Sequence, residues 1–287
     1  MAPPTFDLQS HSTCSDGALA PRAVVAAAQA AGVELLALSD HDTVDGVDEA
    51  LEAAAACGLG LVTATELSAI DGDREDLHVL GYGIDHRSAE LLDALERFRA
   101  DRAARAHRMA DALREAGLEL EFPDRGDRPV GRPHLAQAAF EHPANRMRLR
   151  DENIVNFSQL LEAYLVPGRP GYRRRTTPTV AEAVETIHAA GGVAIWAHPF
   201  WDVDDGEEFL RLVDRFTASG LDGVEAFYVT HTAEQTRLAA TYCAEHGLLT
   251  TGSADFHGPE HPRFHAFRAF DLHGLEPDLG PIRSARS

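Results

Sequence analysis

The 287-residue chain is short of cysteine, of long apolar runs and of positive charge, and each shortage excludes a class of protein. Its three cysteines (Cys14, Cys57 and Cys243) lie far apart without a Cys-x-x-Cys spacing, so neither a disulfide framework nor a thiolate zinc site is predicted. No apolar run is long enough to cross a membrane, and the first residues lack the basic flank and apolar core of a signal peptide. We therefore expect a cytoplasmic protein, and no segment indicates an obligate protein partner.

Positive charge is scarce: 26 lysines and arginines face 46 aspartates and glutamates, for a net charge of −20. Such a charge repels polyanions at long range, so a surface that coats long nucleic acid is not expected. An anionic substrate would have to be held by local positive charge, supplied by metal ions, by an arginine cluster or by both.

What the sequence has in abundance is alternation between short apolar segments and alanine-rich helical segments. The segments expected to be strands are residues 6–9, 34–39, 59–67, 77–84, 193–200, 222–229 and 248–258. The segments expected to be helices are residues 21–32, 46–58, 179–192, 206–220 and 232–247. This repetition predicts an α/β fold with a parallel sheet, either open or closed into a barrel.

The middle of the chain breaks this rhythm. A long charged amphipathic helix is expected from residue 88, followed by short helices and a loop rich in proline and arginine. We interpret residues 88–178 as a helical insertion that caps the sheet domain formed by residues 1–87 and 179–273. The last segment, residues 274–287, has few apolar side chains and is expected to be loose.

Histidines and carboxylates recur at the ends of the expected strands, where α/β enzymes build their sites. One such histidine would more often be a structural hydrogen-bonding residue, and the Asp42 carboxylate could cap a helix or orient His41. Eight together indicate two or three divalent ions (Mn²⁺, Zn²⁺ or Fe²⁺), with Glu66 as the expected bridge. The predicted ligands are His11, Asp16, His41, Glu66, His78, His198, Asp255 and His257. The other ten histidines are expected mostly on solvated helices and loops.

Seven motifs, in order along the chain, match a known family: DLQSHSTCSDG, LALSDHDTVDG, TATELSA, DLHVLGYGID, GRPHLAQA, GGVAIWAHPF and GSADFHG. Together they resemble the PHP (polymerase and histidinol phosphatase) family of metal-dependent phosphoesterases. The nearest branch resembles stand-alone phosphatases of nucleoside 3′,5′-bisphosphates, some of which trim RNA from its 5′ end. The resemblance implies a distorted (β/α)7 TIM-like barrel with a helical insertion.

The same resemblance implies how three ions would share the ligands. One ion would be held by His11, Glu66 and Asp255. A second would be held by Glu66, His78 and His198, and a third by Asp16, His41 and His257.

The chain departs from the family at Gln9, because the first motif is normally His-x-His and here reads Gln9-Ser10-His11. An amide oxygen is a poor zinc ligand beside imidazoles, so Gln9 is expected to be at most a weak ligand. The first site would then be weakened, retuned towards a harder metal, or empty. Alternatively, Gln9 hydrogen-bonds a metal-bound water, and hydrolysis survives; we favour surviving hydrolysis.

Substrate contacts are expected in the insertion. The resemblance supports Arg132, His134 and Arg169 as phosphate contacts, and Tyr172 and Arg173 are added because tyrosine can stack on a base and arginine can chelate phosphate. Within the run Arg173–Arg175, a solvated loop is the ordinary alternative. The predicted catalytic residues are Glu66, through its ions, and His134, as a proton donor to the leaving group.

We therefore predict a metal-dependent phosphoric ester hydrolase that uses metal-activated hydroxide to release a terminal phosphate from small nucleotides or short oligonucleotides. Two alternatives remain open. The chain could be a non-catalytic nucleotide-binding module because of Gln9, or a redox enzyme with a di-metal centre, which colour and oxygen dependence would reveal.

Overall fold

A computed structural model of the chain describes residues 4–124, 126 and 130–284. The chain forms two compact units, Met1–Leu95 with Pro178–Ser287, and Glu96–Thr177. The helix α3 (Ala89–Glu115) begins in the first unit and ends in the second. We expected the insertion to start at residue 88, next to the beginning of this helix. The boundary between the units lies within the helix instead, after the buried Leu91 and Leu95.

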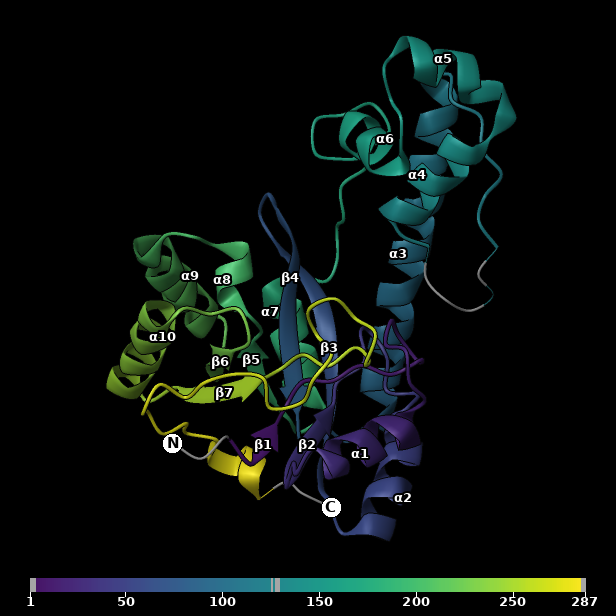
Figure 1. The fold of residues 1–287 in the computed structure, drawn as a ribbon. Helices are drawn as coiled ribbons and strands as arrows, with labels where there is room; N and C mark the ends of the chain where they lie inside the picture. The colour runs from purple at the N-terminus through teal and green to yellow at the C-terminus, as the bar shows by residue number, and fades with distance from the viewer. Residues whose placement is uncertain (1–3, 125, 127–129, 285–287) are drawn as a thin grey trace. The chain divides into compact units, whose positions relative to one another are not determined.

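The first unit is built on a seven-stranded sheet whose strands are neighbours in chain order (Figure 1). The Leu8 N–H donates to the Gly252 carbonyl at 3.2 Å, and Ser10 pairs with Phe256, so the first and last strands also meet. The predicted distorted α/β barrel is thereby confirmed as a nearly closed sheet with helices outside it. The strands are β1 (Phe6–Asp7), β2 (Leu35–Leu38), β3 (Gly60–Asp71), β4 (Arg74–Tyr82), β5 (Val193–Trp196), β6 (Gly223–Tyr228) and β7 (Leu249–Ser253).

The expectation of an all-parallel sheet is wrong at one strand, because β4 runs antiparallel to both β3 and β5. Only Gly72 and Asp73 separate β3 from β4, and Gly72 has a φ of 57°. A two-residue loop joins antiparallel strands, whereas parallel neighbours need a long crossover. β3 also extends beyond the expected segment, so Glu66 lies inside the strand rather than at its end.

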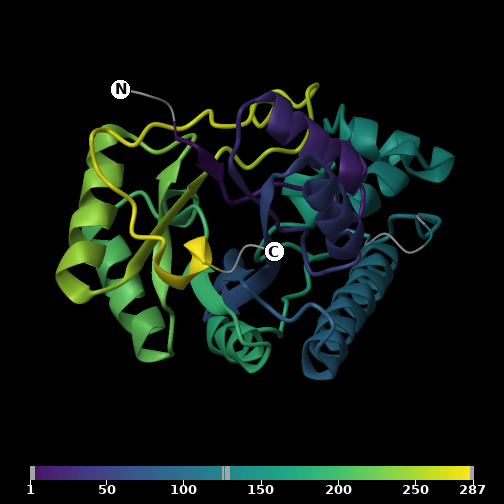
Figure 2. The same ribbon diagram turned by 90° about the horizontal axis from the view of Figure 1, so that it is seen from below.

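Helices cover the outside of this sheet. Figure 2 shows α1 and α2 (purple) on one side of the strands and α9 and α10 (yellow-green) on the other. Val24, Val25 and Ala28 of α1 pack with Leu36 and Leu61 in one buried apolar cluster, which fixes α1 against β2 and β3. The helices are α1 (Pro21–Ala30), α2 (Val47–Cys57), α7 (Val180–Ala189), α9 (Gly206–Ala218) and α10 (Ala233–His246).

Two further segments differ from the sequence-based expectation. The strand expected over residues 193–200 ends at Trp196, and a short helix, α8 (Pro199–Asp202), follows it. Proline suits this position because it lacks the N–H that a continued strand would need and fits the first turn of a helix.

The last described residues, 274–284, are packed rather than loose. Leu279 and Ile282 are buried there, a short 3₁₀ helix (Gly280–Arg283) forms, and the Thr250 N–H donates to the Asp278 carbonyl at 2.8 Å. Two well-placed apolar side chains and one backbone hydrogen bond therefore anchor a segment whose average composition is polar.

The second unit has a core of its own. The end of α3 packs with α4 (Arg132–Glu141), α5 (Arg146–Asp151), α6 (Phe157–Tyr164) and the 3₁₀ turn Pro143–Asn145. The fully buried side chains at its centre include Leu113, Leu135 and Leu160. Across the described residues, no helix combines the length and the apolar composition needed to span a bilayer.

Candidate metal centre

The structure brings all eight predicted ligands into one cluster in the first unit. They come from segments far apart in the chain, because the strands around a nearly closed sheet deliver their ends to a common centre. His11 and Asp16 follow β1, and His41 follows β2. Glu66 and His78 lie within the β3–β4 hairpin, His198 follows β5, and Asp255 and His257 follow β7.

Glu66 is the centre of this cluster, and its carboxylate is fully buried. Its Oε1 lies 2.7 Å from His78 Nδ1 and 3.2 Å from His198 Nε2. Its Oε2 lies 3.1 Å from His11 Nε2 and 3.7 Å from His41 Nδ1. The two oxygens thus face different pairs of imidazoles, which is the arrangement that a carboxylate bridging two ions requires.

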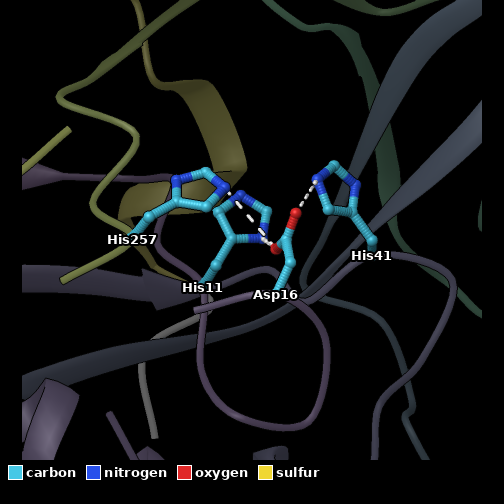
Figure 3. Close-up of side chains that lie close together, drawn as sticks. All are labelled: His11, Asp16, His41 and His257. Carbon is cyan, nitrogen blue, oxygen red and sulfur yellow. Dashed lines mark ion pairs between the residues drawn. The ribbon is translucent and has the colours of Figure 1, made fainter. Parts of the chain in front are cut away.

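Among the residues that the structure describes, three groups of side chains have ligand atoms that all lie within 4.8 Å of one another. The first, His11 with Glu66 and Asp255, equals a predicted ligand set, and another adds His11 to the predicted set of Asp16, His41 and His257 (Figure 3).

The third group joins His41, rather than the expected His198, to Glu66 and His78. His198 Nε2 nevertheless lies 3.2 Å from His78 Nδ1 and also 3.2 Å from Glu66 Oε1. The assignment of each ligand to one ion therefore stays a prediction.

The chemistry of the donors fits divalent cations. His11 Nδ1 and Nε2, His41 Nδ1 and Asp255 Oδ1 are buried without a hydrogen-bond partner in the described part of the chain. Even so, His11 Nε2 approaches Glu66 Oε2 to 3.1 Å and Asp255 Oδ1 to 3.0 Å. Ligands about 2.1 Å from one ion lie about 3.0 Å apart in an octahedron and about 3.4 Å apart in a tetrahedron. Imidazole with carboxylate suits zinc, manganese and iron.

The electrostatics of the cluster favour a cation. Burial would raise the pKa of Glu66, but the surrounding imidazoles, chiefly His41 and His78, hold it well below its usual range. Burial lowers the pKa of His41 to about 4, so this imidazole is in the neutral form that binds metal. Burial also acts to lower the pKa of His198, but contact with Glu66 outweighs it and raises that pKa to about 9. A cation taken up beside His198 would displace this proton.

Two aspartates near the cluster fix the loops that carry its ligands. Asp40 accepts hydrogen bonds from the Ser12 N–H, the Ser12 hydroxyl and the Ser15 hydroxyl, at 2.6–2.7 Å. Asp42 accepts from the N–H and the hydroxyl of Ser68. The helix-capping alternative for Asp42 is wrong, because the N-cap of α2 is Gly46.

Three further buried groups were missed from the sequence. Glu225 accepts the His198 N–H at 2.9 Å, and burial raises its pKa to about 8. The Tyr228 hydroxyl donates to Asp255 Oδ2 at 2.8 Å. Asp7 accepts backbone N–H groups on either side of the last ligands, and burial raises its pKa to about 7. The available signal was an acidic residue inside each apolar segment, 6–9 and 222–229.

The backbone is strained at the same place. His198 has a φ of 28° and Asp255 a φ of 54°, in the left-handed region that side chains other than glycine rarely adopt. Such conformations cost of order 1–3 kcal/mol each and concentrate at functional sites.

A sequence profile of the PHP domain matches residues 7–158, which is more than half of the chain. A 3′,5′-nucleoside bisphosphate phosphatase from Chromobacterium violaceum is 35% identical over 260 residues, covering 88% of this chain and 87% of the relative. The chain belongs to the PHP domain family. A 5′-3′ exoribonuclease from Haemophilus influenzae is 34% identical over 257 residues, covering 88% of this chain and 90% of the relative.

A solved structure has a similar fold. An amidohydrolase from Chromobacterium violaceum, determined with bound sulfate and no metal, is 31% identical and superposes with a TM-score of 0.78. The match covers 99% of this chain and 98% of the other. As a PHP protein, the chain is a metal-dependent hydrolase of phosphoric esters.

Gln9, where the family resemblance led us to expect the first histidine of the motif, does not point an oxygen into the cluster. Its amide N–H donates to Glu66 Oε2 at 2.8 Å, and its carbonyl accepts from the Ser253 hydroxyl at 3.2 Å. An ionised carboxylate only accepts hydrogen bonds, so the amide nitrogen must be the atom that faces Glu66.

The predicted substrate contacts all lie in the second unit. His134 Nδ1 accepts the Gly131 N–H at 3.0 Å at the start of α4, which Arg132 begins. Arg173 donates to the carbonyls of Pro170 and Tyr172. Their roles, and that of Arg169, stay predictions.

The ring of Tyr172 lies 5.6 Å from the Arg105 guanidinium. Of the arginine run, Arg175 is buried and Arg174 is exposed, so a fully solvated loop is wrong for Arg175.

Most of the ten remaining histidines were expected to be solvated, and His231 is an exception. His231, just after β6, is buried against Phe200 and Tyr228. Burial lowers its pKa to about 4.

Proposed function

We propose that the chain releases a terminal phosphate from small nucleotides of the 3′,5′-bisphosphate type, or from short oligonucleotides, with two or three divalent ions. The observation that carries the proposal is the buried Glu66 carboxylate with imidazoles at both oxygens and two further carboxylates nearby. The names of two relatives, a 3′,5′-nucleoside bisphosphate phosphatase and a 5′-3′ exoribonuclease, support the substrate class.

Each residue has a role in this proposal. The eight clustered side chains hold the ions, which would supply an activated water and offset the charge of the phosphoryl oxygens. The side chain of Asp16 is 56% exposed whereas that of Glu66 is 0%, so the cluster meets solvent on the Asp16 side, where a phosphate can enter. Tyr228 and Glu225 hold Asp255 and the His198 backbone in place. Arg132, His134, Arg169, Tyr172 and Arg173 would contact the nucleotide, with His134 donating a proton to the leaving group.

The test is phosphate release with Mn²⁺, Zn²⁺ or Fe²⁺ from a panel of adenosine 3′,5′-bisphosphate, short RNA and long duplex DNA. We expect Mn²⁺-stimulated release from the first two, and the net charge of −20 disfavours the third. Cleavage of duplex DNA without activity on bisphosphates would contradict the proposal. Tight nucleotide binding without turnover at any metal would instead support the non-catalytic module.

A further inference from the structure

Trp201 is a large, solvent-exposed apolar side chain beside the metal cluster. It is 51% exposed, and its ring centroid lies 5.9 Å from that of His198. Its orientation is fixed, because the indole N–H donates to the Thr230 hydroxyl at 2.8 Å. An exposed indole held in one direction has a surface available for a flat partner, whereas the other tryptophan, Trp196, is buried.

The indole belongs to an aromatic edge that borders the cluster. Its ring lies 5.7 Å from that of Phe264, which in turn lies 5.5 Å from the His257 ring. Tyr228, which hydrogen-bonds Asp255, meets Trp201 edge-on at 6.4 Å. A continuous row of rings in the first unit thus connects two candidate ligands, His198 after β5 and His257 after β7.

A cation completes this edge. The Arg263 guanidinium lies 5.5 Å from the Trp201 ring centroid, and Arg263 is exposed. Its guanidinium has no ion pair with any residue that the structure describes, although acidic residues outnumber basic ones by 46 to 26. An arginine left free of carboxylates in so acidic a chain keeps its forked donors available for a phosphate.

We propose that Trp201 and Arg263 form the nucleoside subsite: the base stacks on the face of the indole that Arg263 does not cover, and Arg263 binds the phosphate that is not cleaved. The inference rests on the proposed function and names its substrate more narrowly, as a nucleotide with a base and a second phosphate. A phosphate ester without a base would leave the indole unused. A purely apolar partner would leave the guanidinium unused.

The first experiment measures binding directly and does not depend on turnover. In the Trp196→Phe protein, loaded with metal, Trp201 is the only tryptophan, so its fluorescence reports on the subsite. We expect AMP to quench this fluorescence and ribose 5-phosphate to leave it unchanged. AMP that inhibits phosphate release without any quenching would overturn the inference.

The second experiment compares substrates. Trp201→Ala should raise KM for adenosine 3′,5′-bisphosphate relative to the inhibition constant of ribose 5-phosphate by roughly 5–150-fold, the range that corresponds to 1–3 kcal/mol of base stacking. Trp201→Phe, which keeps a ring, should recover most of this ratio. Arg263→Ala should raise KM for the bisphosphate relative to KM for adenosine 3′-monophosphate, which lacks the phosphate that is not cleaved, and Arg263→Lys should recover part of the loss. The same ratio in the wild-type and Trp201→Ala proteins would overturn the inference.

The two proposals fail in different ways. If the protein hydrolyses nucleotides but Trp201→Ala leaves the ratio unchanged, the subsite is wrong and the proposed function stands. Quenching by AMP without hydrolysis of any phosphate ester removes the proposed function and keeps the subsite. A thermal melt of each variant checks folding, which the exposed position of Trp201 should leave nearly unchanged.

Discussion

Replacing Gln9 with histidine should tighten the most weakly held ion of the cluster. In the native chain, the amide N–H of Gln9 is bonded to Glu66 and its carbonyl to Ser253. To offer that oxygen to an ion, the amide would have to turn and lose its bond to the carboxylate, which costs about 1.5–3 kcal/mol. As the structure places it, Gln9 contacts the Glu66 carboxylate through its N–H and presents no oxygen to the cluster, whereas Gln9→His would add an imidazole.

The size of the effect follows from the kind of contact that changes. Loss of a residue that only orients a ligand typically changes metal affinity by about 10–100-fold, and a new direct ligand should do at least as much. Gln9→His should therefore tighten the weakest ion by at least about 10-fold, which is about 1.4 kcal/mol. Gln9→Ala, which removes the hydrogen-bond donor to Glu66, should weaken the binding of this ion.

The assay is a metal titration of the three proteins against a chromophoric chelator, with elemental analysis after dialysis. Gln29→His, at an exposed position of α1 where the side chain donates to the Cys57 carbonyl, controls for a histidine that binds metal without the cluster. If the native protein already holds three tight ions and neither Gln9 variant changes them, Gln9 is a spectator and this reasoning is refuted.

Three other perturbations test separate parts of the structure. Glu66→Gln should lose more than one metal equivalent by elemental analysis and lower turnover by at least about 10²–10³-fold, since both oxygens face candidate ligands; full metal content would remove Glu66 from the centre of the site. Because burial lowers the pKa of His231 to about 4, the unfolded chain protonates first and stability falls as pH drops below 6.5. In urea unfolding with a chelator present, the free energy of unfolding should fall by about 2 kcal/mol less between pH 7.5 and pH 5 in His231→Phe than in the wild-type protein. An equal fall in the two proteins would contradict this. Asp40→Asn should weaken metal binding and lower stability by roughly 1–3 kcal/mol, since an amide cannot accept all three hydrogen bonds from Ser12 and Ser15; Ser15→Ala should have a smaller effect, and equal effects would argue against the role of Asp40.

Most of the cluster could be predicted from the sequence, because the ends of strands can be located from local periodicity and α/β enzymes build their sites there. His11, His41 and Asp255 each follow a short apolar segment, and a common sheet edge brings such positions together. Local periodicity does not give strand direction, so the antiparallel β4, which places His78 opposite Ser68 of β3, was not predicted. The glycine turn at Gly72 was the local signal for it.

Long-range contacts account for what the sequence could not reveal. Asp7 is buried by bonding backbone N–H groups of Ala254 and Arg268, which lie at the other end of the chain. A period of two residues within the segment 6–9 carries no information about them. The packing of residues 274–284 depends in the same way on the burial of Leu279 in the folded unit, which cannot be inferred from average composition.

The closure of the sheet between β1 and β7 also has a consequence during synthesis on the ribosome. The group formed by His11, Glu66 and Asp255 combines residues near both ends of the polypeptide, and Asp7 is bonded by the Ala254 and Arg268 N–H groups. A nascent chain of 250 residues therefore carries most of the ligands but lacks the carboxylate and imidazole that β7 delivers. The metal cluster can thus assemble only after residue 257 has been translated, so a product truncated before β7 would lack two of the candidate ligands.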